Sequence, residues 1–159
     1  YQHLIDSSDG WTAFDYRTTI IGRAPCFVLV KTKPASNRFS MHNVTVAYRE
    51  LAEVFTPAEI DIITRFSEAM ALDWAALDVL RDAESGRIYI VDVNKTDTGP
   101  AVDLSWRDRG RVMCAISHHF LTMIAGAAQP GVTGTASQAA RTAPEPIRTG
   151  YVIETPRQV

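Results

Sequence analysis

The sequence lacks the features that mark several common protein classes. It has two cysteines, Cys26 and Cys114, and no CxxC pair, so neither a disulfide framework nor a zinc knuckle is expected. It has no run of lysines and arginines, which argues against nucleic acid as a partner. Its apolar stretches are too short for a membrane span, and no charged-then-apolar leader is seen. We therefore expect a reduced, cytoplasmic protein with neither a membrane nor a nucleic-acid partner.

The overall composition is that of an ordinary globular protein. The 159 residues are 46% hydrophobic and 21% charged, with a formal net charge of −2. A chain of this length can bury one hydrophobic core and is too short for two large domains. Residues 127–159 hold half of the eight prolines and little that could pack, so this tail is predicted to be disordered.

Hydrophobic periodicity predicts an α+β fold for residues 1–126, with an antiparallel sheet and helices packed on one face of it. Thr56-Pro57-Ala58-Glu59 is typical of a helix start with a capping box. Residues 33–43 are polar and are predicted to form a loop. The expected strands cover residues 12–21, 25–31, 44–48, 75–81 and 87–94, and the expected helices cover 57–71 and 105–124.

A pair of facing carboxylates is the most informative pattern. Asp92 and Asn94 are two residues apart in a predicted strand, so they share one face. If the hairpin centres near Ser85, Asp78 lies directly opposite Asp92, about 5 Å away, where like charges are destabilising. A bound divalent cation would explain the pair, because Mg²⁺ accepts carboxylate and amide oxygens. The alternative is a solvated or salt-bridged pair. Without a cation, we expect Asp78→Asn to stabilise the fold, unless that carboxylate holds a structural hydrogen bond.

A second charged pair precedes this hairpin. Asp15 and Arg17 share one face of the first predicted strand. They could form an exposed ion pair of little energetic value, or contact a phosphate or ribose, because arginine binds phosphate oxygens well. Lys31, Lys33 and Arg38 could add positive charge from the neighbouring strand and loop.

Taken in order, these segments resemble the C-terminal half of an ATP-grasp enzyme, over about residues 1–104. The segments that carry the resemblance are Tyr1-Gln-His-Leu-Ile5, Asp15-Tyr-Arg17, a basic strand end at Lys31, a polar loop with Arg38, His42 and Asn43, Leu77-Asp78-Val-Leu80 and Val91-Asp92-Val-Asn94. Asp92 stands where the family more often has Glu.

The resemblance implies an ATP- and Mg²⁺-dependent ligase, with Mn²⁺ as the alternative ion. Such an enzyme activates the carboxylate of a small molecule or peptide as an acyl phosphate, which an amine or similar nucleophile then attacks. An upstream segment or chain would complete the cleft. The implied nucleotide-binding residues are Gln2, Leu4, Ile5, Asp15, Arg17 and Lys31, the implied catalytic residues are Arg17, Lys31 and Arg38, and the implied metal ligands are Asp78, Asp92 and Asn94. A catalytically incomplete fragment that acts as a binding or scaffold module is the alternative hypothesis.

Overall fold

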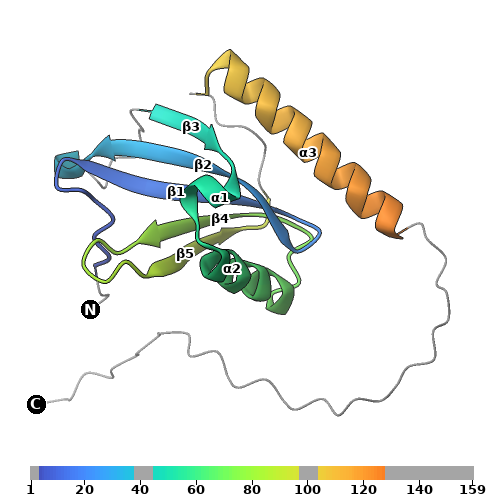
Figure 1. Cartoon of the computed structure of the whole chain (residues 1–159), viewed down its shortest axis with the longest axis horizontal. Coiled ribbons are helices and arrows are strands. Elements are labelled where there is room, and N and C mark those ends of the chain that lie inside the picture. Colours follow the sequence, from blue (N-terminus) through green and yellow to red (C-terminus); the bar gives the residue numbers. More distant parts are fainter. Residues whose placement is uncertain (1–3, 38–44, 97–103, 128–159) are drawn as a thin grey trace, which may run out of the picture. The chain divides into compact units, whose positions relative to one another are not determined.

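Five antiparallel strands form one sheet in the order β3-β2-β1-β4-β5 (Figure 1). The computed structural model describes residues 4–37, 45–96 and 104–127. The strands are β1 (Thr12–Ile21), β2 (Ala24–Pro34), β3 (Thr45–Arg49), β4 (Trp74–Arg81) and β5 (Ile88–Asn94), and the helices are η1 (Ala35–Asn37), α1 (Leu51–Val54), α2 (Pro57–Ala69) and α3 (Trp106–Ala127). The predicted α+β class with an antiparallel sheet is confirmed.

The turn between β1 and β2 sets the central hairpin of the sheet. Gly22 and Arg23 both have positive φ angles, 60° and 68°. Two such residues between strands match the right-handed twist of an antiparallel pair. The two long strands then pair from Thr12 opposite Pro34 to Ile21 opposite Ala24. β2 therefore runs three residues beyond its predicted end and takes up the start of the predicted loop, of which residues 38–44 lie outside the described ranges.

The first hydrophobic cluster lies between the sheet and helices α1 and α2. It contains Ile20 and Val28 from the sheet and Ile63 from α2, all fully buried. The predicted capping box starts α2, because Thr56 and Glu59 satisfy each other's backbone N–H groups. This cap and the buried face of α2 fix the helix where the sequence predicted it, ending two residues early.

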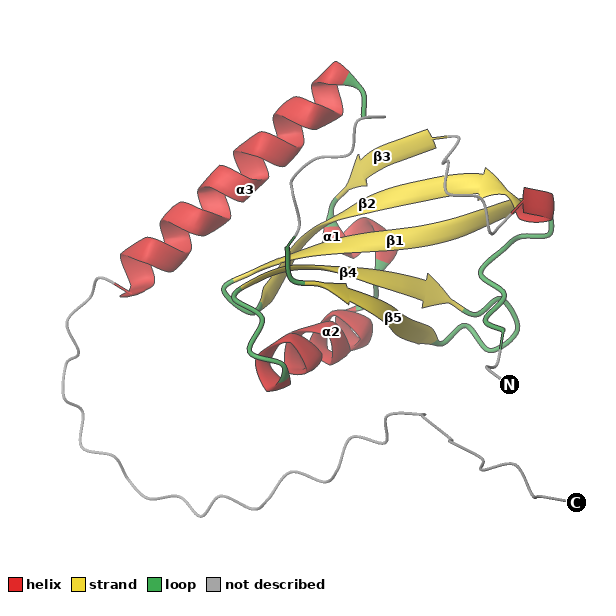
Figure 2. Cartoon of the chain, turned by 180° about the vertical axis from the view of Figure 1, so that it is seen from behind, coloured by secondary structure: helices red, strands yellow, loops and turns green. Residues whose placement is uncertain are grey.

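The second hydrophobic cluster lies on the opposite face of the sheet, under α3. Ile21 and Phe27 belong to it, and each is one residue away from a member of the first cluster. Because side chains alternate between faces along a strand, the two clusters lie on different sides. The prediction that the helices cover one face was therefore wrong, since α1 and α2 lie on one side and α3 on the other (Figure 2).

Helix α3 is attached by a narrow face. Val112 is its one buried side chain among those described, and Ala115, Ile116, Phe120 and Met123 are partly buried against the sheet. Trp106 is 87% exposed. The helix ends at Ala127, the first residue of the predicted tail, and residues 128–159 lie outside the described ranges.

Candidate functional site

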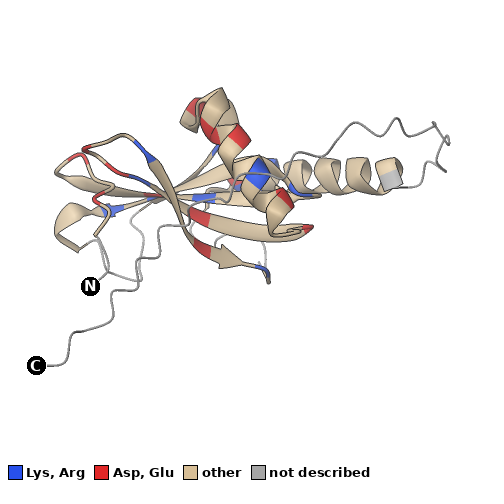
Figure 3. Ribbon diagram, turned by 90° about the horizontal axis from the view of Figure 1, so that it is seen from below, with Lys and Arg blue, Asp and Glu red and all other residues tan. Residues whose placement is uncertain are grey.

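The face of the sheet that packs against α3 carries charged residues as well as the second cluster. On β1, Asp15 and Arg17 share this face with Ile21, because they are separated by even numbers of residues. The strand register places Asp15 opposite Lys31 of β2 and Arg17 opposite Asp78 of β4. Both acidic and basic positions are therefore found on neighbouring strands (Figure 3).

An ion-pair network joins these side chains across three strands. Lys31 Nζ donates to Asp15 Oδ2 at 3.1 Å and to Asp78 Oδ1 at 3.2 Å. Arg17 Nη1 donates to the same Asp78 Oδ1, also at 3.2 Å. The four side chains are each between 13% and 21% exposed, so solvent screens their interactions only in part.

Asp15 is the least satisfied member of the network. Its Oδ1 atom is buried and has no hydrogen-bond partner within the described part of the chain. Burial raises the pKa of Asp15 above its usual value, while the neighbouring Lys31 opposes the rise and Asp78 adds to it. A positively charged or hydrogen-bonding ligand near Asp15 would therefore find an acceptor that is available without breaking an existing hydrogen bond.

A β-bulge brings Asp92 to the same face. Val79 pairs with Ile90, whereas Asp78 pairs with Asp92, so Val91 is an extra residue in β5. Two adjacent residues at a classic bulge point to similar sides of the sheet. The bulge keeps Ile90 and Val93 against the first hydrophobic cluster, and leaves Val91 and Asp92 exposed on the other face.

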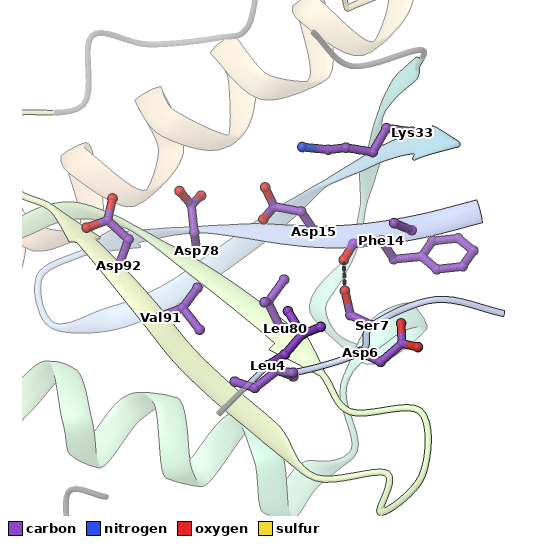
Figure 4. A pocket seen from close by; sticks show the side chains of 12 residues that line it. Leu4, Asp6, Ser7, Phe14, Asp15, Lys33, Asp78, Leu80, Val91 and Asp92 are labelled. Carbon is purple, nitrogen blue, oxygen red and sulfur yellow. Dashed lines mark hydrogen bonds between the residues drawn. The ribbon is translucent and has the colours of Figure 1, made fainter. Parts of the chain in front are cut away.

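A cavity of about 370 Å³ lies beside the three carboxylates. Figure 4 shows Asp15, Asp78 and Asp92 projecting from the strands in a row, with Lys33 beyond Asp15. Apolar side chains form another part of the wall, chiefly those of Leu4, Ile5, Leu80 and Val91. The cavity thus has an apolar part and a charged part, which is a typical arrangement in small-molecule sites.

The segment before β1 completes the cavity and is held by hydrogen bonds at two places. The backbone N–H of Phe14 donates to the carbonyl oxygen of Ser7 at 2.9 Å. The Ser7 hydroxyl donates in turn to the carbonyl oxygen of Phe14 at 2.6 Å. Ala83 N–H donates to the Asp6 carbonyl at 2.7 Å, from the turn between β4 and β5. These bonds hold Leu4 and Ile5 next to the sheet.

Most of the described residues that the sequence singled out are therefore neighbours. The cavity is lined by Leu4, Ile5, Asp15, Asp78 and Asp92. Arg17 and Lys31 do not line it, but both donate hydrogen bonds to Asp78. Asn94 shares the face of Asp92, but its Oδ1 accepts from the backbone N–H of Thr96 at 3.0 Å and does not line the cavity. Gln2 and Arg38 lie outside the described residues.

The sequence did not single out several apolar residues of the wall, Leu80 and Val91 among them. Leu80 is two residues beyond Asp78 in the same strand, so alternation alone could have placed it on the same face. Val91 could not be found in this way, because it reaches the cavity only through the bulge.

The network changes the expectation for Asp78. We expected repulsion from Asp92 to dominate, yet Asp78 is held by Arg17 and Lys31. This ion-paired arrangement removes the reason to expect that Asp78→Asn stabilises the metal-free fold. Within the described ranges, no group of three or more His, Cys, Asp or Glu side chains could hold a metal ion. A metal ion bound by Asp78 and Asp92 would therefore need further ligands besides the described His, Cys, Asp and Glu side chains, such as water or phosphate oxygens.

The chain gives no match to a known protein family, to a curated protein or to a solved structure. The resemblance to ATP-grasp enzymes therefore remains a prediction. Within the described residues, no helix combines the length and the apolar character needed to cross a membrane.

Proposed function

We propose that this chain binds ATP together with Mg²⁺, or alternatively Mn²⁺, as part of an ATP-grasp-type ligase that activates a carboxylate. The observation that carries the proposal is the Asp78–Asp92 pair, which lies across two strands and beside Lys31 and Arg17 at the edge of a half-apolar cavity. A nucleotide bound with Mg²⁺ needs three kinds of partner. Carboxylates bind the metal ion, basic side chains bind the phosphates, and an apolar wall contacts the base.

The donor set fits Mg²⁺ as a partial site. Asp78 and Asp92 would supply carboxylate oxygens from one face, with Asn94 as a neighbouring amide. Mg²⁺ commonly takes one or two carboxylates and fills its remaining positions with water and substrate phosphates, so a complete cage of protein ligands is not required. When bound, the ion would neutralise charge on the phosphates during phosphoryl transfer.

The nucleotide would lie along the cavity. Its base would contact Leu4, Ile5, Leu80 and Val91, which form the apolar part of the wall. Its phosphates would extend toward Lys31 and Arg17. These two cations now bind carboxylates, and phosphate oxygens are equally good acceptors for them.

The proposed reaction has two steps. The γ-phosphoryl group passes to a carboxylate oxygen of the substrate, and ADP leaves. The nitrogen of an amine, or a similar nucleophile, then attacks the acyl carbon, loses a proton and displaces inorganic phosphate. Arg17 and Lys31 would hold the phosphates during the first step, and the role of Arg38 stays a prediction from the resemblance. An upstream segment or chain is proposed to complete the cleft.

Calorimetric titration of the 159-residue chain with ATP tests this function. We expect saturable binding with Mg²⁺ present, and binding at least tenfold weaker in Asp92→Asn, because one ligand of the ion is lost. Asp61→Asn removes the same charge from the exposed surface of α2 and should leave the affinity unchanged. Equal affinity in wild type and Asp92→Asn would overturn the site assignment. No binding by any variant would favour the alternative of a binding or scaffold module.

A further inference from the structure

Lys31 holds a position that a divalent cation at Asp78 would otherwise take. Its ammonium group bridges Asp15 Oδ2 and Asp78 Oδ1 at 3.1 and 3.2 Å, and its side chain is 13% exposed. Arg17 Nη1 lies 3.2 Å from the same Asp78 oxygen. The charge of Asp78 is therefore already neutralised by two side chains of the protein.

A free divalent cation would have to compete with these groups. A cation bound to Asp78 would lie only a few ångströms from Lys31, where the repulsion between like charges is strong in a partly buried site. Asp92 alone offers a single carboxylate across the strand pair. Binding of a bare cation should therefore be weak while Lys31 stays on Asp78.

Lys31 has two other places to bind when it leaves Asp78. Its bond to Asp15 can remain, and the second oxygen of Asp15 is buried with no partner among the described residues. The phosphates of a nucleotide would provide further acceptors beside it. The ammonium group of Lys31 therefore keeps a negatively charged partner after it leaves Asp78.

We propose that Lys31 is an internal counter-ion that blocks the cation site at Asp78 until nucleotide phosphates draw it away. This inference rests on the proposed function, because nucleotide is the ligand that releases Lys31. The cation and the nucleotide then bind cooperatively, and each strengthens the binding of the other by the same factor. Removing the charge of Lys31 uncouples them, so that the bare cation binds more tightly and the nucleotide more weakly.

The test measures Mn²⁺ binding to the 159-residue chain by electron paramagnetic resonance in the absence of nucleotide. We expect Lys31→Met to bind Mn²⁺ at least about fivefold more tightly than wild type, at the lower end of typical coupling between sites. Lys95→Met is the matched control, because it removes the same charge just beyond β5, whereas the ion pairs of Asp78 within the described residues are with Arg17 and Lys31. It should change the affinity less than twofold. If Lys31→Met fails to fold, Lys31→Gln removes the charge and keeps a donor for Asp15.

A second titration, with ATP, separates this inference from the proposed function. ATP affinity is measured with Mn²⁺ and with a chelator, and the gain from Mn²⁺ should be larger in wild type than in Lys31→Met. Nucleotide binding by wild type without tighter Mn²⁺ binding in Lys31→Met would overturn the counter-ion role and leave the proposed function intact. No nucleotide binding by wild type would overturn the proposed function, and with it the release of Lys31 by phosphates.

Discussion

Asp78 is the residue on which the local electrostatics depend. One of its oxygens accepts from both Arg17 and Lys31, and Asp92 lies across the strand pair. The attraction to two cations at 3.2 Å competes with the repulsion from one carboxylate, and the two directly bound cations should dominate. The sequence predicted that Asp78 pairs with Asp92. That prediction assumed a regular hairpin without a bulge, which differs from the hairpin in the structure.

The predicted pairing of Asp78 with Asp92 was correct because two deviations from the assumed hairpin cancel: a shifted hairpin centre and a bulge. Below the bulge, Val79 pairs with Ile90, so the hairpin centres between residues 84 and 85, half a residue before Ser85. Continued without change, this register would place Asp78 opposite Val91. The extra residue restores the predicted pairing. A bulge has no reliable signal in a single sequence, because it depends on which side chains of both strands must reach the core.

Asp78→Asn should lower the free energy of unfolding of the metal-free protein by about 1–3 kcal/mol at neutral pH, because Arg17 and Lys31 both lose the charge of Asp78, although Lys31 keeps its bond to Asp15. Asp92→Asn is the matched control and should stay within about 0.5 kcal/mol, because Asp92 is exposed. Urea unfolding of the three proteins measures the difference. A gain of stability in Asp78→Asn would show that repulsion from Asp92 dominates after all.

Glu59 should make stability depend on pH. Burial disfavours its charged form, but the hydrogen bonds from Arg81 and Thr56 outweigh burial and hold the pKa of Glu59 below its usual value of 4.5. A lowered pKa in the folded state stabilises the fold above pH 4.5, and this stabilisation is lost as the pH falls through the folded-state pKa. Glu59→Gln should therefore be less stable than wild type at neutral pH.

The comparison of unfolding curves at several pH values checks this prediction. The stability difference between wild type and Glu59→Gln should shrink steadily below pH 4.5. Glu68→Gln, on the exposed surface of the same helix, should show little difference at any pH. A difference for Glu59→Gln that is constant with pH would mean that its charge does not contribute.

At the scale of elements, local signals in the sequence were sufficient for most of the fold. The capping residues Thr56 and Glu59 identified the start of α2, and short β-rich or apolar runs bounded by turn residues identified the strands. The face that α3 covers was not accessible in this way. Periodicity shows that a helix has an apolar side, but β1 has apolar residues on both faces, Ile20 and Ile21 among them, so either face could have received the helix.

Helix α3 should open more easily than the sheet. Val112 is its one buried side chain among those described, whereas β1 lies in the middle of the sheet and contains buried residues on both faces. Free energies of local opening follow the density of buried contacts. Amide hydrogen exchange of the native protein should therefore be faster for residues 113–126 than for β1 and β4. Equal protection of α3 and β1 would contradict a weakly attached helix.

At the scale of the whole molecule, the sheet separates two environments. One face is mainly apolar and is covered by α1 and α2, with Arg81 of β4 paired to Glu59 of α2 near its end. The other is divided between the second cluster under α3 and the charged network beside the cavity. The first hydrophobic cluster fixes the strand register, and the register brings Asp15, Arg17, Lys31, Asp78 and Asp92 together.

The most direct test of the proposed site is paramagnetic broadening in the assigned amide spectrum of the 159-residue chain on addition of Mn²⁺ and ATP. We expect broadening to centre on Asp78 and Asp92 and to extend to Arg17 and Lys31, while α2, on the far face, is spared. Asp92→Asn should weaken the effect, and Asp61→Asn should not. Broadening that is absent, or that centres away from the charged network, would contradict a cation–nucleotide site on this face of the sheet.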